Sequence, residues 1–413
     1  MKKLLSSLLA TLSLVSLSAA EDSRPVPQIN GPKPLSQRMV ESEMSRIPDA
    51  VRMDGVAKPK WNYTTGLELL SIIDAGERYD KDEYINYALD WLEVMLAEDG
   101  ESILTYKVSN YNLDHICPGR LLYYALDRTG EARFRNAIEL LWGQLEGQPR
   151  TVEGGYWHKK SYPHQMWLDG LYMAEPFKAE YLTRFASEEV AAHGWEDIIH
   201  QFVLVAEKTY DPTTGLFRHA WDSSKEMFWC DKNSGQSQHA WLRAMGWYTV
   251  AIVEVLDYMP EDVEGRSKLI AILNHIYKTI PAYADPESGM WYQVMDCPTR
   301  KGNYQESTGS IMLTYAMLKG ARKGYLPEEF TAKGAQLYEK FVERFMRENE
   351  DGTISMTDCC AVGGLGGKKN RMGDFDYYLS EPIIENDCKG VGPFIWASME
   401  YEMLQNPSLE PLP

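Results

Sequence analysis

Residues 164–177 read HQMWLDGLYMAEPF and carry the two features on which the fold depends. An apolar and aromatic run with helical spacing begins here, and one carboxylate, Asp169, stands near its start. A long link rich in glycine and aromatic residues, 147–164, precedes the run, and a short link, 185–194, follows it. The same order of long link, helix, short link and helix recurs along the chain.

Apolar residues at i, i+3 and i+4 predict helices throughout the chain, whereas strands with clean alternation are scarce. The predicted helices span 36–52, 63–78, 82–98, 113–127, 131–146, 165–183, 195–209, 238–257, 263–283, 306–322, 328–348 and 390–404. One long stretch, 351–388, has no helical period and holds the pairs Gly363-Gly364 and Gly366-Gly367. A loop of that length is usually functional or mobile.

The links between these helices alternate in length. Long links precede the even-numbered helices, at 99–112, 147–164, 210–237, 284–305 and 349–389, and short links follow them. Antiparallel helices with all long loops at one end describe six helical hairpins in a ring. We therefore predict an all-α fold, an (α/α)6 barrel over 36–413 as a single domain, with the even-numbered helices inside.

Unusual polar residues fall near the N-terminal ends of the even-numbered helices. They are Tyr63, Asp114, Asp169, His239 with Arg243, Glu306 and Lys389. Helix N-termini carry the positive end of the helix dipole, which favours an anionic ligand. The rim formed by these ends is the candidate site.

Composition and charge narrow the class of protein. The chain has 413 residues, 44% hydrophobic and 25% charged, which excludes collagen, disordered and membrane-bundle compositions. The net charge of −18 is a poor surface for nucleic acid. Residues 1–20 combine Lys2 and Lys3 with an apolar run and small residues, as in a cleaved signal peptide, and 21–35 form a proline-rich extended leader. We expect a secreted or periplasmic monomer with no membrane span.

No motif for a metal or a cofactor is evident. The eight histidines lack i, i+4 pairing, no segment has the carboxylate spacing of a calcium loop, and no nucleotide-binding glycine motif follows a strand. The six cysteines are sparse for this length and form no CxxC motif. We predict no metal and no cofactor.

Two carboxylates suit acid–base chemistry at the rim. Asp169 lies in an apolar run, where desolvation raises a carboxyl pKa as a general acid requires, but an N-cap aspartate explains it equally well. Asp114, in NLDHICPG at 112–119, lies at the same place near the start of the preceding inner helix, although its spacing alone favours a capping role. Paired carboxylates are the usual equipment for cleaving glycosidic bonds.

Aromatic residues with arginine indicate a sugar that carries a carboxylate. Trp221, Trp241 and Trp247 can stack on a pyranose ring, and Arg243 can bind an acid group through two hydrogen bonds. The alternative is that the tryptophans pack in the core and Arg243 pairs with a structural acid.

Several of these motifs together resemble glycoside hydrolase family 105, the unsaturated rhamnogalacturonyl hydrolases. The resemblance rests on LDHICPG at 113–119, HQMWLDGLYMAEPF at 164–177, YDPTTGLFRHAWD at 210–222, HAWLRAMGWY at 239–248, ESTGSIMLTYAMLKG at 306–320 and YYLSEPIIENDCKGVGPF at 377–394. It covers most of the chain from Trp61 to Tyr401. One departure is Cys388, where a small residue is expected, and it bears on the preference for the leaving sugar.

The resemblance implies an (α/α)6 barrel that hydrates the C4=C5 double bond of a 4,5-unsaturated uronic acid. It makes Asp169 the general acid and base and Asp114 its catalytic support. The implied substrate-binding residues are Tyr63, His219, Trp241, Arg243 and Trp247, to which we add Met166, His164 and Glu306. No cofactor is implied, and the partner is an unsaturated oligosaccharide.

Three alternatives remain open. An inverting glycosidase would use Asp114 and Asp169 as an acid and base pair on saturated sugars. A non-catalytic barrel would only bind carbohydrate. Within the family, the substrate is a rhamnogalacturonan fragment from pectin or a β-linked glucuronyl unit from ulvan or arabinogalactan, and family frequency favours pectin.

Overall fold

The computed structural model describes residues 22–409, so the predicted signal peptide at 1–20 lies outside the described residues. Residues 22–34 contain no helix or strand. This segment is tied to the rest of the molecule, because the Glu348 amide donates to the Pro25 carbonyl at 2.7 Å. Arg24 also donates to Asn349 at 2.9 Å.

Each of the twelve predicted segments contains a long helix. The long helices are α1 (Leu35–Arg46), α2 (Tyr63–Tyr79), α3 (Asp82–Met95), α4 (Arg120–Thr129), α5 (Ala132–Glu146), α6 (Leu168–Arg184), α7 (Glu188–Thr209), α8 (Leu242–Tyr258), α9 (Arg266–Thr279), α10 (Ser307–Arg322), α11 (Glu329–Phe345) and α13 (Cys388–Gln405). A short helix, α12 (Phe375–Ser380), lies in the predicted glycine-rich loop. Five 3₁₀ turns complete the helical elements: η1 (Ala50–Gly55), η2 (Val108–Asn110), η3 (Leu113–His115), η4 (Cys117–Gly119) and η5 (Ile280–Tyr283).

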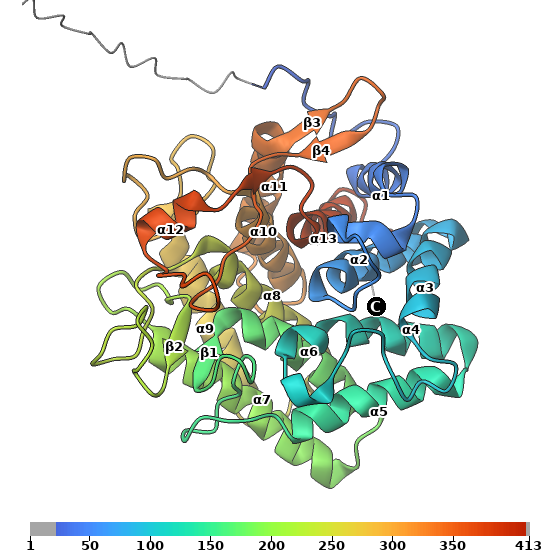
Figure 1. The fold of residues 1–413 in the computed structure, drawn as a ribbon. Coiled ribbons are helices and arrows are strands. Elements are labelled where there is room, and N and C mark those ends of the chain that lie inside the picture. The colour runs from blue at the N-terminus through green and yellow to red at the C-terminus, as the bar shows by residue number, and fades with distance from the viewer. Residues whose placement is uncertain (1–21, 410–413) are drawn as a thin grey trace, which may run out of the picture.

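The inner helices form a closed ring. Helix α6 packs on α8, α8 on α10, α10 on α13 and α13 on α2, while η4 joins α2 to α6 beside the short α4. Figure 1 shows these helices gathered at the centre, with α1, α3, α5, α7, α9 and α11 outside them. The predicted (α/α)6 barrel is confirmed.

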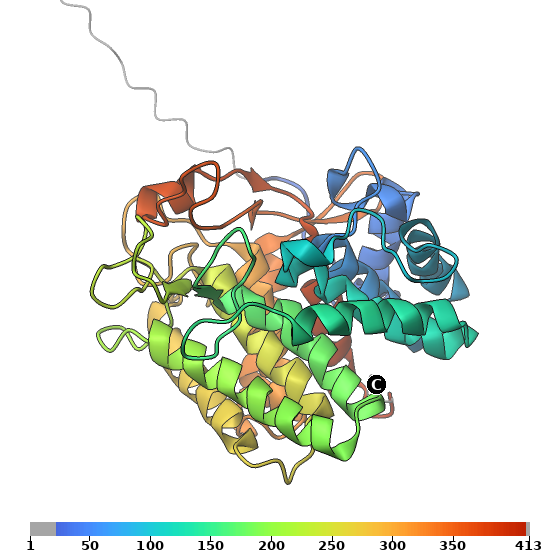
Figure 2. The same cartoon turned by 60° about the horizontal axis from the view of Figure 1, so that its bottom comes forward.

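Six short strands form three antiparallel pairs outside the ring. They are β1 (Gln165–Trp167) with β2 (Ala220–Asp222), β3 (Met346–Glu348) with β4 (Ile354–Met356), and β5 (Cys359–Cys360) with β6 (Ile383–Ile384). In Figure 2 the red segment with α12 lies across one end of the barrel, together with the long loops. The long loops therefore share one end, as their spacing predicts.

Several helices begin later than predicted, and the reasons are local. Helix α6 begins at Leu168, because residues 165–167 pair with β2 instead. Helix α4 begins only at Arg120, because the chain before it forms the 3₁₀ turns η3 and η4, the second with Pro118 in its first turn. Helix α11 ends at Phe345, where β3 takes over.

The interior is filled by large aromatic and aliphatic side chains, with Trp61, Trp91 and Trp291 among the largest that are fully buried. All six cysteines are described and none is bonded to another. Among residues 22–409, no helix combines the length and apolar content needed to cross a bilayer.

Candidate active site

The β1–β2 ladder brings Asp169 and His219 together. Trp167 pairs with Ala220, and the next hydrogen bond along the ladder joins the Leu168 amide to the His219 carbonyl at 3.1 Å. Asp169 follows directly as the second residue of α6. Two side chains 50 positions apart in the sequence therefore face each other because two three-residue strands pair in one register.

Asp169 and His219 approach closely but are not hydrogen-bonded. The Asp169 Oδ2 atom lies 3.3 Å from His219 Nε2, and neither atom has a hydrogen-bond partner among the described residues. The other ring nitrogen, His219 Nδ1, lies 2.8 Å from the Tyr378 hydroxyl of α12. A carboxylate oxygen and an imidazole nitrogen left free in a buried place are typical of groups that act on a ligand.

Asp114 is held by two basic side chains. Its carboxylate is bonded to Lys159 Nζ and lies 3.3 Å from His158 Nε2. Burial raises the pKa of Asp114, but the charge of Lys159 and the hydrogen bond from His158 outweigh burial and hold the pKa well below its ordinary value. Asp114 is therefore an anion at any working pH.

His158 links this carboxylate to β1. Its amide donates to the Gln165 carbonyl at 2.8 Å, its carbonyl accepts from the Leu113 amide at 3.1 Å, and its ring stacks on Trp167 with centroids 4.6 Å apart. A Cβ on Gly170 would lie 3.1 Å from His158 Nδ1, so only glycine fits on this face of α6 without a shift. Asp114 and Asp169 are thus positioned on the same framework.

Arg243, the second residue of α8, is buried beneath the rim. Its Nη1 atom donates to the Cys360 carbonyl and, at 3.3 Å, to Thr308 Oγ1. The guanidinium lies 4.7 Å from the Trp241 ring centroid, and Nε has no partner among the described residues. One edge of the guanidinium is anchored, and the donor on its other edge remains for a ligand.

Aromatic side chains from several inner helices line the same region. Trp247 stacks on Tyr172 with centroids 4.7 Å apart and meets the edge of Tyr63 at 6.1 Å. Trp241 stacks on Tyr378 and donates from Nε1 to Gln293 at 3.1 Å. Tyr172, Trp241, Trp247 and Tyr378 are buried and pack in the interior, and Tyr63 is the ring of this set that stays half-buried.

Several charged side chains shift the pKa of Tyr63, the first residue of α2. Burial raises the pKa of Tyr63 well above its ordinary value, Asp114 and Asp169 raise it further, and Arg243 lowers it. Charges act at this strength only over short distances in a protein. Charged residues of η3, α6 and α8 therefore lie near Tyr63 of α2.

Of the predicted substrate-binding residues, Glu306, Met166 and His164 do not lie beside Asp169 and Tyr63. Glu306 is the N-cap of α10, fully buried, and its oxygens accept from the amides of Thr308, Gly309 and Cys360 at 3.0, 2.8 and 2.9 Å. Its carboxylate is fully occupied, so the structure gives it a capping role in place of the predicted sugar contact.

Met166 and His164 also lie apart from this point. Side chains alternate along β1, so Met166 faces away from Trp167 and packs with Leu204 of α7 over Gly155. His164 is exposed in the preceding loop, with its ring 4.6 Å from Trp157. The structure does not bring either side chain to Asp169.

The sequence prediction missed His158, Lys159 and Tyr378. The first two lie in GGYWHKK, residues 154–160, within a long link that the sequence already marks as rich in glycine and aromatic residues. Tyr378 lies in YYLSEP, a quoted motif whose residues were not assigned a role. His158 and Lys159 lie in a loop and Tyr378 lies in the short helix α12 within a predicted loop, where spacing carries no information on side-chain contacts.

Comparison with known proteins supports the family. The model of Glycosyl Hydrolase Family 88 matches residues 35–405. A family 105 glycoside hydrolase of C. acetobutylicum ATCC 824 is 39% identical, with a TM-score of 0.85 over 90% of this chain and 100% of that one. The unsaturated rhamnogalacturonyl hydrolase YesR of Bacillus subtilis (strain 168) is 24% identical over 71% of this chain and 78% of that protein.

A third relative shows the fold alone. The unsaturated glucuronyl hydrolase specific for heparin has a TM-score of 0.65 at 14% identity, over 91% of this chain and 99% of that one. The arrangement of helices is therefore shared with a hydrolase that is named for unsaturated glucuronyl groups.

Proposed function

The chain belongs to the glycosyl hydrolases of families 88 and 105, and from this premise we propose that it removes a 4,5-unsaturated uronic acid from the non-reducing end of rhamnogalacturonan fragments. The observation that carries the proposal is the Asp169 carboxylate, whose buried Oδ2 atom lies 3.3 Å from His219 Nε2 and has no hydrogen-bond partner among the described residues. The named relative YesR acts on unsaturated rhamnogalacturonyl groups and supports the choice of substrate.

Hydration of a double bond suits this site better than inverting hydrolysis. An inverting enzyme needs one carboxylic acid and a second carboxylate free to activate water. Asp114 is bound to Lys159 and His158, and its low pKa makes it a weak base. Hydration needs only one group, which gives a proton and then takes one back.

Asp169 performs both proton transfers in the proposed reaction. Its carboxylic acid donates a proton to C4, which leaves positive charge shared between C5 and the ring oxygen. Water then adds at C5, and the Asp169 carboxylate takes a proton from it. The resulting hemiketal opens and releases the remaining sugar, with no direct attack at C1. His219 Nε2 lies beside this carboxyl group, 3.3 Å from Asp169 Oδ2.

The uronate is proposed to bind beside Arg243. The Arg243 Nε donor has no partner among the described residues, and the N-termini of α6 and α8 add positive potential. The net charge of −18 opposes binding only weakly, since physiological salt screens charges beyond about 8 Å. Tyr63, half-buried against Trp247, is placed to carry the sugar ring.

Ultraviolet absorbance tests the proposal directly. The conjugated double bond of the unsaturated uronate absorbs, and hydration removes the band. The chain is incubated with lyase-generated disaccharides from rhamnogalacturonan and from ulvan, and with their saturated counterparts. Loss of absorbance on the rhamnogalacturonan disaccharide, with saturated sugars untouched, is the expected result. Faster loss on the ulvan disaccharide would assign the β-glucuronyl substrate, and cleavage of saturated sugars alone would overturn hydration.

Export is a separate part of the proposal. Lys2 and Lys3 before an apolar run, followed by Ser18-Ala19-Ala20, support cleavage near residue 20. N-terminal sequencing of the chain recovered from outside the cytoplasm should begin near Glu21. Recovery of the full-length chain from the cytoplasm would contradict export.

A further inference from the structure

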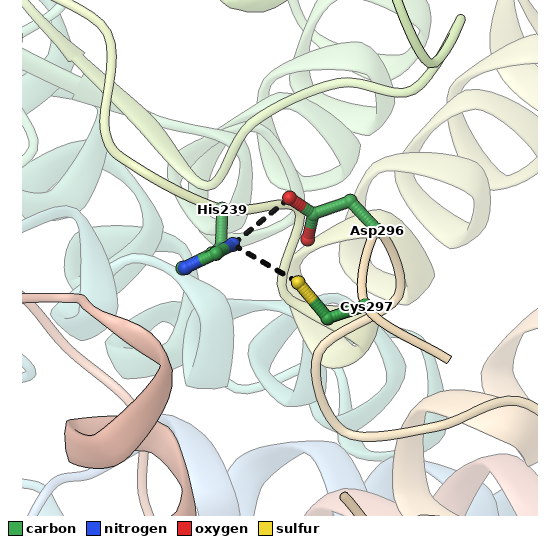
Figure 3. Close-up of side chains that lie close together, drawn as sticks. All are labelled: His239, Asp296 and Cys297. Carbon is green, nitrogen blue, oxygen red and sulfur yellow. Dashed lines mark hydrogen bonds and ion pairs between the residues drawn. The ribbon is translucent and has the colours of Figure 1, made fainter. Parts of the chain in front are cut away.

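A compact group of three potential metal ligands lies in the loops beside the candidate active site (Figure 3). His239 precedes α8, while Asp296 and Cys297 lie in the loop between α9 and α10. His239 Nδ1 is 2.9 Å from Asp296 Oδ2 and 3.8 Å from Cys297 Sγ, and the three ligand atoms all lie within 4.8 Å of one another. A search of the described residues for three or more histidine, cysteine or carboxylate side chains close enough to share an ion finds this group.

We propose that His239, Asp296 and Cys297 bind a Zn²⁺ ion. Imidazole nitrogen, carboxylate oxygen and thiolate sulfur are the ligands that zinc prefers, at bond lengths of about 2.0–2.3 Å. Tetrahedral geometry at those lengths separates neighbouring ligands by about 3.3–3.8 Å. The observed separations require only small side-chain rotations. Binding displaces the Cys297 thiol proton to solvent and leaves the fourth position for water.

Neighbouring hydrogen bonds hold the ligands in position. The Ala240 amide donates to the second carboxylate oxygen of Asp296 at 3.2 Å, and Asn303 Nδ2 donates to the Cys297 carbonyl at 2.9 Å. The His239 and Asp296 side chains are 16% and 14% exposed, so an ion can enter from solvent. Such outer hydrogen bonds orient metal ligands in known sites.

The site would be coupled to the candidate active site through the backbone. The His239 carbonyl accepts from the His219 amide at 3.1 Å, and the Met295 amide donates to the Ala240 carbonyl at 2.9 Å. An ion that joins His239 to the 296–297 loop therefore braces the strand end that carries His219. The role is structural, because the ligands are distinct from the groups that face Asp169.

One positive charge opposes the ion. The Arg300 amide donates to the Cys297 carbonyl at 3.1 Å, and the Arg300 guanidinium lies 3.8 Å from the Phe375 ring centroid. Its side chain is 51% exposed, so it can turn toward solvent. The sequence could not show the site, because His239 and Asp296 are 57 residues apart and follow no metal-binding spacing.

Metal content and cobalt spectroscopy test the proposal on the full-length mature chain without an affinity tag. The chain is stripped with a chelator, titrated with Zn²⁺ and measured for bound metal and for thermal midpoint. We expect one equivalent of tightly bound zinc and a raised midpoint. Co²⁺ in place of zinc should give a thiolate-to-metal charge-transfer band, which reports Cys297 as a ligand. Less than a tenth of an equivalent at micromolar zinc would overturn the site.

Variants separate these ligands from other zinc-binding residues. Cys297→Ser and His239→Ala should each weaken zinc binding by at least about 100-fold, since loss of outer partners alone costs 10–100-fold. Cys230→Ser is the matched control, because the Cys230 thiol also faces a carboxylate, at 3.8 Å from Asp222 Oδ2, but belongs to no metal-binding group. Arg300→Gln should tighten binding. Undiminished binding or an unchanged cobalt band in Cys297→Ser would place the ion elsewhere and refute the proposal.

Discussion

Both ends of the barrel interior hold buried charged groups, but the hydrogen-bond partners of these groups differ. At the loop end, Asp169 Oδ2 and His219 Nε2 face each other without hydrogen-bond partners among the described residues. Toward the other end, Glu254 accepts from Arg120 at 2.8 Å and from Lys319 at 2.7 Å. Glu254 lies eleven residues beyond Arg243 on α8, which corresponds to about 16 Å along the axis.

This difference locates the site better than cavity size does. A cavity of about 270 Å³ lies at the paired end, lined by Arg120, Glu254 and Lys319 among others. Its charges already neutralise one another, so a ligand there would have to displace strong ion pairs. At the loop end the free oxygen and nitrogen gain partners only when a substrate binds. Arg120 also keeps two guanidinium nitrogens without hydrogen-bond partners, but its charge is matched by Glu254, whereas the Asp169 carboxylate has only the His219 ring within ion-pair distance among the described residues.

The largest effect should come from Asp169→Asn. The amide has nearly the same shape but cannot give or take the catalytic proton, so kcat should fall at least about 1,000-fold. Stability should hold, because Asp169 Oδ2 has no hydrogen bond to lose among the described residues. Absorbance assays on the unsaturated disaccharide and thermal unfolding measure the two quantities. A rate within tenfold of the unchanged chain would refute the acid–base role.

Glu254→Gln should show the reverse pattern at the paired end. The change leaves Arg120 and Lys319 with less negative charge and should destabilise the fold by about 3–5 kcal/mol, measured by urea unfolding. The kcat should stay normal at temperatures where the variant is folded. Glu329→Gln is the control, since it breaks an exposed pair with Lys333 and should leave stability unchanged. Equal stability of Glu254→Gln would remove the contrast between the two ends.

The stability of the protein at acid pH provides a second test of the Glu254 carboxylate. Burial raises the pKa of Glu254, but Lys319 and Arg120 outweigh burial and lower it to about 2. An acid whose pKa is lowered on folding stabilises the protein above its unfolded pKa, about 4.3, and loses that contribution as the pH falls toward the folded value. The unchanged chain should lose stability between about pH 4 and pH 2, and Glu254→Gln should lose less there.

Helical periodicity and link length are enough to predict the barrel and the rim. Each hairpin leaves its own trace in the sequence, and the polar helix starts at Tyr63, Asp169 and Arg243 share one phase. The short strands leave no such trace, because β1 and β2 have three residues each and alternate too briefly to detect. Only the ladder shows that Met166 faces α7 and that His219 faces Asp169.

Loop contacts set the limit of prediction from the sequence. Lys159 and His158 hold Asp114 across 45 and 44 positions, and Tyr378 reaches His219 across 159. Nothing local specifies these pairs, since they depend on how the long loops fold over one another. Glu306 shows the converse, because a carboxylate at a helix start can be a cap or a ligand until its hydrogen bonds are seen.

Arg243→Lys tests whether the guanidinium shape matters at the unpaired end. Lysine keeps the charge but cannot both anchor on the Cys360 carbonyl and present a second donor to a carboxylate. The KM should rise about 10–100-fold with a smaller change in kcat. Arg218→Lys is the control, since Arg218 pairs with Asp211 at 2.9 Å outside the site. An unchanged KM would remove Arg243 from uronate binding.

Glu175 of α6 combines features of the two ends. It is buried, and one of its carboxylate oxygens has no hydrogen-bond partner among the described residues. Burial raises its pKa to about 7, although Lys178 lowers it. Between about pH 4.3 and pH 7 the folded chain keeps a proton that the unfolded chain releases, so stability falls as the pH rises through this window. Glu175→Gln should remove that loss and gain up to about 3 kcal/mol at pH 8. Glu196 is exposed, so the control variant Glu196→Gln should change neither the stability at pH 8 nor its loss between about pH 4.3 and pH 7. A less stable Glu175→Gln variant at pH 8 would mean that Glu175 is ionised in the folded chain.

Tyr378→Phe should have the smallest effect and tests how the free pair is oriented. Burial raises the pKa of Tyr378 well above 10, so its hydroxyl keeps a proton, and His219 Nδ1 is its partner at 2.8 Å. Which of the two atoms donates depends on the tautomer of His219, and the hydroxyl orients the ring in either case. Loss of the hydroxyl should lower kcat about five- to tenfold with little change in KM. Tyr377→Phe removes a hydroxyl that accepts from the Gly364 amide instead and should keep kcat. Equal losses in the two variants would show that α12 acts only through packing and does not orient His219.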